Sequence, residues 1–210
     1  MTAPDPLDDP TGWFEHRYSQ AEQGQATIPW DRGEPRYLLT EWARDLDGNG
    51  KQAIVVGCGL GSDADFLAGL GFDTVAFDAS VTAIKLARDR FPGSKVAFLT
   101  ADLLQLPEDW RGAFDLVVEI QTVQSIPLHL RESAIARIGS LVAPGGTLFV
   151  AAGVREEGEP LDGPPWRLTF DEVSSFASGD LQLSQEITVH PDPDMPDVRR
   201  WLAIFTRAAS

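Results

Sequence analysis

Residues 53–61 read AIVVGCGLG, and this stretch decides the fold. Its first four residues form a continuous apolar run, which is typical of a strand buried on both faces of a parallel sheet. Gly57, Gly59 and Gly61 follow, and glycine lets a backbone turn sharply and approach a ligand without a Cβ clash. The pattern predicts a strand, a tight turn and then a helix. By itself it is compatible with a ligand site or with a turn that binds nothing.

The alternation of strand and helix patterns continues along the chain. Apolar runs predict strands at 53–56, 74–77, 95–99, 114–118 and 147–152, and helical spacing or caps predict helices near 35–46 and at 63–70, 81–88, 128–142 and from 169. Two last strands, 181–189 and 201–207, are expected to be antiparallel. Repeated strand–helix units imply a doubly wound α/β fold with a mostly parallel, seven-stranded, Rossmann-like sheet and a final antiparallel strand. We find no linker, so residues 1–210 are expected to form a single domain.

Charge and composition exclude several classes of partner. The 210 residues carry 17 basic and 32 acidic side chains, a net charge of -15, which argues against binding to nucleic acid or to an anionic membrane surface. The N-terminus does not resemble a signal peptide, and no stretch approaches the roughly 20 apolar residues of a membrane span. A single cysteine, Cys58, fits a reducing compartment. We expect a cytoplasmic protein, with an oligomeric state that the sequence leaves open.

Two aspartates at predicted strand ends make the glycine turn more specific. Asp78 ends the second strand, with Ala79 beside it, and its carboxylate is placed to accept hydrogen bonds from ribose hydroxyls. Asp102 follows the third strand, where its carboxylate can accept a hydrogen bond from the amino group of adenine while the backbone beside Leu103 contacts the adenine ring. A surface turn is the alternative for Asp78. Together these features predict a nucleoside ligand.

The position of the third glycine argues against a dinucleotide oxidoreductase. The dehydrogenase fingerprint has its third glycine at the sixth position, which is Ser62 here, whereas this chain has it at the fifth, Gly61.

The series that includes FDLVVE at 114–119 and LVAPGGTL at 141–148 resembles the class I S-adenosylmethionine-dependent methyltransferases from about residue 50 to 152. The resemblance implies S-adenosylmethionine as cofactor and S-adenosylhomocysteine as product. One departure is Val55, where that superfamily often has an acidic residue.

A narrower resemblance covers nearly the whole chain. WFEHRY at 13–18, PWDRG at 29–33 and GPPW at 163–166 are similar to the thiopurine and thiol/halide methyltransferase group. This likeness implies an N-terminal helical lid, residues 1–47, over a cofactor-binding core, residues 48–210. Arg17 stands where some relatives have an aromatic residue.

The same likeness implies further cofactor-binding residues. Trp13 and Trp30 would close over the cofactor, and Glu119 and Ile120 would lie beside its methionine portion. Aromatic faces and a carboxylate can both stabilise the sulfonium cation. For the tryptophans, plain core packing is the alternative.

The acceptor is expected to be a small molecule, most of all a thiol or another soft nucleophile. A thiol is partly ionised near neutral pH and needs no dedicated base, whereas a hydroxyl or amine acceptor needs one. Tyr18 and Glu119 are candidates for that base, and no residues have metal-ligand spacing. Residues 11–40, 119–127 and 153–168 are expected to supply the acceptor pocket. O- or N-methylation of a specialised metabolite, and a non-catalytic nucleoside-binding module, remain alternatives.

Overall fold

The computed structural model describes residues 4–5, 7–161 and 163–209. The chain divides into two compact units, Met1–Leu106 and Pro107–Ser210. The predicted boundary between lid and core, at residues 47 and 48, lies inside the first unit.

The first unit is built on three parallel strands in the order β3-β2-β1. Its elements are α1 (Pro10–Glu22), α2 (Tyr37–Trp42), β1 (Gln52–Val56), α3 (Ser62–Gly69), β2 (Asp73–Asp78), α4 (Val81–Arg90), β3 (Ala97–Thr100) and the short 3-10 helix η1 (Leu103–Gln105). The register pairs Val56 with Phe77 and Asp78 with Thr100. The carboxyl ends of these strands, where the glycine turn and the two aspartates follow, therefore lie at one edge.

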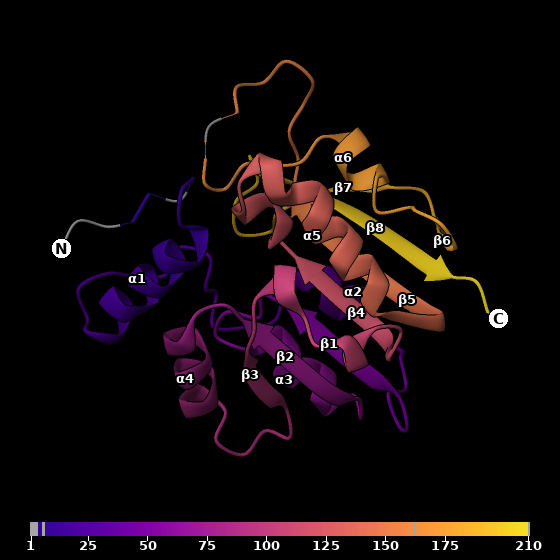
Figure 1. Cartoon of the computed structure of the whole chain (residues 1–210), viewed down its shortest axis with the longest axis horizontal. Coiled ribbons are helices and arrows are strands. Elements are labelled where there is room, and N and C mark those ends of the chain that lie inside the picture. The colour runs from indigo at the N-terminus through magenta and orange to yellow at the C-terminus, as the bar shows by residue number, and fades with distance from the viewer. Residues whose placement is uncertain (1–3, 6, 162, 210) are drawn as a thin grey trace. The chain divides into compact units, whose positions relative to one another are not determined.

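The N-terminal helix α1 packs against α4 within this unit (Figure 1). Asp9 caps α1, because its side chain accepts a hydrogen bond from the Gly12 amide, and Pro10 occupies the first turn. Ser80 caps α4 as the sequence predicts, with its hydroxyl accepting from the Ala83 amide at 3.0 Å. The N-terminal segment thus contains a helix, as the resemblance implies.

The second unit combines parallel and antiparallel strands. Its elements are the 3-10 helices η2 (Glu108–Trp110) and η3 (Val123–Ser125), the strands β4 (Phe114–Ile120), β5 (Val142–Gly153), β6 (Leu181–Leu183), β7 (Thr188–Pro191) and β8 (Arg199–Arg207), and the helices α5 (Leu128–Leu141) and α6 (Phe170–Ser174). β4 and β5 are parallel, and β8 is antiparallel to β5. The helix α5 packs against β4 and β5 (Figure 1).

The prediction of one continuous strand over 181–189 is wrong. This segment forms two strands, β6 and β7, which pair with successive parts of β8. Four residues separate Leu183 from Thr188, but only two separate their partners on β8, Phe205 and Leu202. The extra residues leave the ladder there, so the described residues contain eight strands where seven were predicted. The α/β fold with a mostly parallel sheet and a final antiparallel strand is confirmed.

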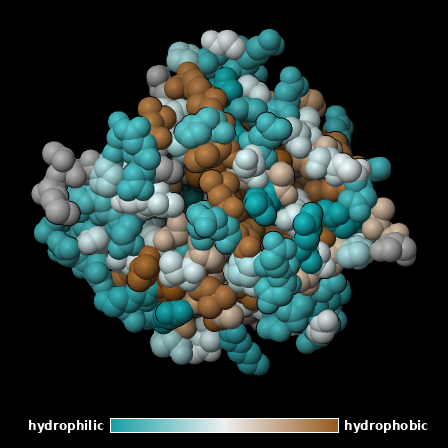
Figure 2. Space-filling model, viewed as in Figure 1, coloured by the Kyte–Doolittle hydropathy of each residue, from teal (hydrophilic) through white to brown (hydrophobic). Residues whose placement is uncertain are grey.

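The surface drawn in Figure 2 is mostly polar. Hydrophilic side chains cover much of the face drawn in Figure 2, with hydrophobic side chains between them. Among the residues that the structure describes, no helix is both long and apolar enough to cross a membrane.

Candidate functional site

The glycine turn after β1 needs glycine for two reasons. Gly57, Gly59 and Gly61 have φ angles of 59°, 53° and 87°, in the left-handed region that side chains disfavour. A Cβ on Gly59 would lie 3.0 Å from the Tyr18 hydroxyl, and one on Gly61 would lie 2.7 Å from the ring of Phe98. The predicted tight turn is therefore confirmed. Glycine is required there by the positive φ angles and by the close approach of Tyr18 and Phe98.

Asp78 connects the end of β2 to this turn. Its Oδ2 accepts a hydrogen bond from the Gly59 amide at 3.0 Å, and its Oδ1 accepts one from the Ser80 amide at 2.9 Å. The residue is 8% exposed. Burial raises the pKa of its carboxyl, the two amide bonds oppose that rise, and the charge of Glu15 adds to it. Ala79, next in the chain, is half-buried.

Asp102 lies at the same edge of the strands as Asp78. The Ala101 amide donates to the Asp78 carbonyl at 3.1 Å, so the residues after β2 and β3 are linked directly. The half-buried Asp102 caps η1 by accepting from the Leu104 amide at 2.9 Å, and Leu103 is buried behind it. The structure brings the predicted adenosine-binding residues together at one edge.

The aromatic residues of the lid segment pack against one another. The rings of Trp13 and Trp30 are 6.0 Å apart, and Phe14 and Tyr18 meet Trp30 edge to face. The guanidinium of Arg17 lies 5.8 Å from the centre of the Trp13 ring. The packing that was the alternative role of the tryptophans is present, and their contact with a cofactor stays a prediction.

Tyr18 is placed beside the glycine turn but is poorly suited to act as a base. It is 2% exposed, and its hydroxyl accepts a hydrogen bond from the Trp30 indole at 2.9 Å. Burial, followed by the negative charge of Asp78, raises the pKa of Tyr18 well above its ordinary value. A tyrosine with this pKa is protonated near pH 7 and can donate a hydrogen bond rather than take a proton.

Sequence reasoning missed Glu15, which anchors α1 to the first turn of α4. Its carboxylate accepts hydrogen bonds from the Ser80 hydroxyl and from the amide and hydroxyl of Thr82. These bonds outweigh burial and lower the pKa of Glu15. Because the partners are 65 and 67 residues away, no local pattern could have revealed the contact.

In the second unit, Glu119 lies next to the last residue of β4 and is a fully buried carboxylate. It is 0% exposed, and its Oε1 accepts from the amides of Thr122 and Val123 at 2.7 and 3.0 Å. Its Oε2 has no hydrogen-bond partner in the described part of the chain. Burial raises the pKa of Glu119 to about 7, against the effect of the two amide bonds.

The turn after Glu119 is strained. Gln121 has a φ of 64°, and it is the one non-glycine residue with positive φ among the described residues. Its amide donates to the Ala151 carbonyl at 2.9 Å, and its carbonyl accepts from the Ser125 hydroxyl at 2.7 Å. Ile120, just before it, is half-buried. Residues held in a disfavoured backbone conformation cluster at functional sites.

No candidate metal centre is found in the ranges that the structure describes: they contain no group of three or more histidine, cysteine or acidic side chains that could hold an ion. The lone Cys58 is a free thiol, and burial raises its pKa well above the ordinary value.

Comparison with protein families and curated proteins finds similarity to methyltransferases. The family described as "Methyltransferase domain" matches residues 53–146. A 2-heptyl-1-hydroxyquinolin-4(1H)-one methyltransferase of Mycobacteroides abscessus is 28% identical over 72% of this chain and 68% of its own length. A thiopurine S-methyltransferase of Marinobacter nauticus is 23% identical over 89% of this chain and 92% of its own length.

Two further comparisons are a relative that matches only part of the chain and a solved structure with a similar fold. A ubiquinone biosynthesis O-methyltransferase of Caulobacter is 31% identical, but the match spans 51% of this chain and 45% of that protein. The crystal structure of the Burkholderia thailandensis 1,6-didemethyltoxoflavin-N1-methyltransferase, with S-adenosylhomocysteine bound, has a TM-score of 0.74 at 15% identity, over 99% of this chain and 93% of that chain. The matched domain and the methyltransferase relatives support an S-adenosylmethionine-dependent methyltransferase. The likeness to the solved structure shows the Rossmann-like fold.

Proposed function

We propose that the enzyme transfers a methyl group from S-adenosylmethionine to an ionisable hydroxyl on a small aromatic acceptor, with Glu119 as the base. The observation that carries this proposal is the buried Glu119 carboxylate, whose Oε2 has no partner in the described chain and whose pKa is about 7. A base is most useful when its pKa lies near the working pH. Relatives that act on a hydroxyquinolinone and in ubiquinone biosynthesis agree with an aromatic acceptor.

On the cofactor side, the first unit supplies the adenosine site. Asp78 would bind the ribose hydroxyls, and Asp102 with the backbone beside Leu103 would bind adenine. Gly57, Gly59, Gly61 and Ala79 would let the ligand approach the backbone closely. Trp13 and Trp30 would cover the cofactor, and Ile120 in the second unit would lie near its methionine portion.

In this mechanism the methyl group moves by in-line displacement. Bound S-adenosylmethionine would supply an activated methyl group and would leave as S-adenosylhomocysteine when its C–S bond breaks and the O–C bond forms. Glu119 would take the proton of the acceptor hydroxyl as that bond forms and would later release it to water. The residues after Glu119 and the loop between β5 and α6 would line the acceptor pocket.

A second candidate is transfer to a thiol. GPPW at 163–166 and the thiopurine S-methyltransferase relative, which matches nearly the whole chain, favour it. A thiolate present near neutral pH would attack without help from a base. The two candidates therefore differ in their need for Glu119.

A matched pair of acceptors tests this difference. The release of S-adenosylhomocysteine is measured with 2-naphthol and 2-naphthalenethiol, and 1-hydroxyquinolin-4-one serves as a third probe. We expect Glu119→Gln to lower kcat for the hydroxyl acceptors by roughly 10²–10⁴-fold, the usual effect of a general base, and to leave kcat for the thiol within a few fold. Glu132→Gln, at an exposed position on α5, is the control. Methylation of the thiol alone, or an equal loss for both acceptors, would overturn the role of Glu119.

A further inference from the structure

The loop between β5 and α6, residues 154–168, is attached firmly at its base. The Leu168 amide donates to the Gly153 carbonyl at 3.0 Å, and the Arg155 amide donates to the Leu168 carbonyl at 2.8 Å. The Trp201 indole also donates to the Leu168 carbonyl, at 2.8 Å. The described residues 156–161 are largely exposed, and their ion pairs to Arg167 and Arg199 are made by the half-exposed or exposed side chains of Glu159 and Glu156. The base of the loop is therefore fixed more tightly than its tip.

Gln124 joins this base to the turn after β4. It lies in η3 and is 2% exposed. Its side-chain oxygen accepts from the Gly153 amide at 2.5 Å, and its backbone carbonyl accepts from the Trp166 amide at 2.6 Å. Gln124 therefore holds both Gly153, immediately before the loop, and Trp166, near the end of the loop. The same turn is held by the carboxylate of Glu119.

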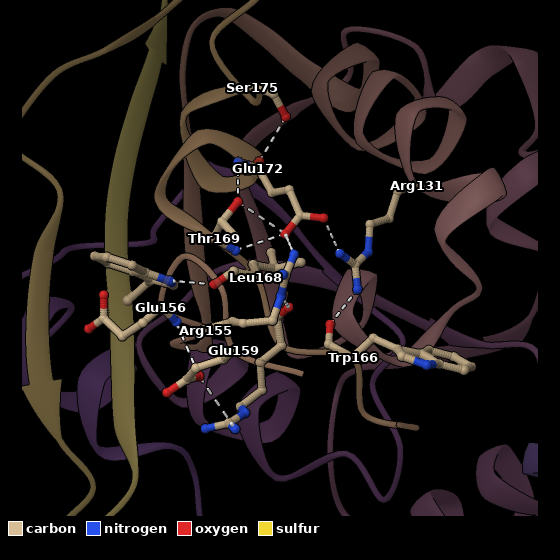
Figure 3. Close-up of polar contacts among 11 residues, drawn as sticks. Arg131, Arg155, Glu156, Glu159, Trp166, Leu168, Thr169, Glu172 and Ser175 are labelled. Atoms are coloured by element: carbon tan, nitrogen blue, oxygen red, sulfur yellow. Dashed lines mark hydrogen bonds and ion pairs between the residues drawn. The ribbon is translucent and has the colours of Figure 1, made fainter. Parts of the chain in front are cut away.

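Arg131 holds the other side of Trp166. Its guanidinium, 5% exposed, donates to the Trp166 carbonyl and pairs with Glu172 (Figure 3). Glu172 also accepts from Arg155 at 3.1 Å and closes the capping box of α6 with Thr169. An arginine with this burial and these two partners has one orientation, so it fixes the Trp166 peptide against α5.

We propose that Gln124 and Arg131 are positioning residues that hold the β5–α6 loop in the conformation that selects the acceptor. The proposal rests on the proposed function, in which this loop lines the acceptor pocket. The backbone N–H of Trp166 donates to the backbone carbonyl of Gln124, the backbone carbonyl of Trp166 accepts from the Arg131 guanidinium, and the Trp166 side chain is buried. Gln124 belongs to the turn that Glu119 stabilises. A change where the loop is attached therefore changes the position of the loop relative to Glu119, the proposed proton acceptor.

The test separates positioning from simple stability. Gln124→Met keeps the length of the side chain but removes the oxygen that accepts from Gly153, whereas Gln124→Glu keeps an oxygen there. For Gln124→Met we expect an acceptor KM at least tenfold higher, kcat within a few fold, and S-adenosylhomocysteine affinity by calorimetry within twofold. Cleavage by a glutamate-specific protease at Glu156, Glu157 or Glu159 should be several-fold faster. Gln124→Glu should restore much of the KM.

Arg199→Gln is the matched control, because it removes only the exposed ion pair of Arg199 with Glu156 in the same loop. Its KM should equal that of the wild type. If Gln124→Met fails to fold, Arg131→Lys, which can keep one of the two partners of Arg131, takes its place with the same readouts. Faster proteolysis with an unchanged KM would overturn the proposal, since the contacts would then serve stability alone. A wild-type enzyme that methylates none of the three probes would instead refute the proposed function.

Discussion

Asp78 combines a structural and a proposed binding task in one carboxylate. Its two oxygens hold the amides of Gly59 and Ser80, which shapes the turn on one side and the start of α4 on the other. An ionised carboxylate retains lone pairs for further donors, so ribose hydroxyls can be bound without loss of these amide bonds. Its burial makes each such bond stronger than it would be in water.

We predict that Asp78→Asn weakens S-adenosylhomocysteine binding by roughly 1.5–3 kcal/mol, the range for hydrogen bonds to a charged group. Isothermal calorimetry measures the change. Asp73→Asn is the control, because Asp73 is exposed at the other end of β2 and should bind the ligand as the wild type does. An affinity for Asp78→Asn equal to that of the wild type would remove Asp78 from the site.

Glu119 gives the enzyme a stability that depends on pH. Its ordinary pKa is 4.5, and burial in the folded state raises the pKa to about 7. Between these values the folded state binds more protons than the unfolded state, so stability falls as pH rises from about 4.5 to about 7 and is then constant. We predict that Glu119→Gln, which keeps an acceptor for the two amides, is more stable than the wild type at pH 8 by roughly 1–3 kcal/mol.

Urea unfolding at pH 5 and pH 8 measures this difference, which should be roughly a quarter as large at pH 5 as at pH 8. A wild type that gains stability on going from pH 5 to pH 8 relative to Glu119→Gln would show that the carboxylate is paired when ionised, which contradicts the raised pKa.

At the scale of elements, periodicity predicted the core well and the contacts between distant elements poorly. The run AIVV at 53–56 and the Ser80 cap are local signals, and the structure confirms both elements. The break between β6 and β7 was missed because it depends on the pairing with β8, in which only two residues lie opposite the four residues 184–187. The glycines and aspartates of the candidate site follow strand ends and could be read from the chain. The clamps made by Gln124 and Arg131 join residues 29 and 35 positions apart and could not.

The docking of α1 on α4 gives a prediction at this scale. Glu15 places a negative charge at the amino-terminal end of α4, where the amides and the helix dipole favour it. We predict that Glu15→Ala destabilises the protein by about 1–2 kcal/mol and speeds tryptic cleavage at Arg17, because α1 loses its main polar anchor. Denaturant unfolding and limited proteolysis measure both effects.

Glu22→Ala is the matched control, since Glu22 also joins α1 to α4, through Lys85, but the Lys85 side chain is 62% exposed. An exposed pair contributes little, so this variant should lose less than about 1 kcal/mol. Equal losses for the two variants would mean that α1 is held by its apolar contacts and not by Glu15.

At the scale of the whole molecule, charge favours a cationic ligand over a dinucleotide. The chain has a net charge of -15, and Asp63 and Asp65 occupy the first turn of α3, directly after the glycine turn. In a dinucleotide site that position receives a diphosphate, which these carboxylates would repel. S-adenosylmethionine carries a sulfonium, an ammonium and a carboxylate group and no phosphate, so its net charge is positive and the same carboxylates are tolerated or favourable.

We therefore predict that S-adenosylhomocysteine, at about 100 times its Kd, stabilises the protein by about 2.7 kcal/mol, and that NAD at the same concentration does not. For a chain of 210 residues this corresponds to a rise in Tm of roughly 5–10 °C, which differential scanning calorimetry can measure. Asp78→Asn should reduce the shift with S-adenosylhomocysteine, because the gain follows the affinity. A comparable rise with NAD would mean that the acidic first turn of α3 does not exclude a diphosphate, and the charge argument would fail with it.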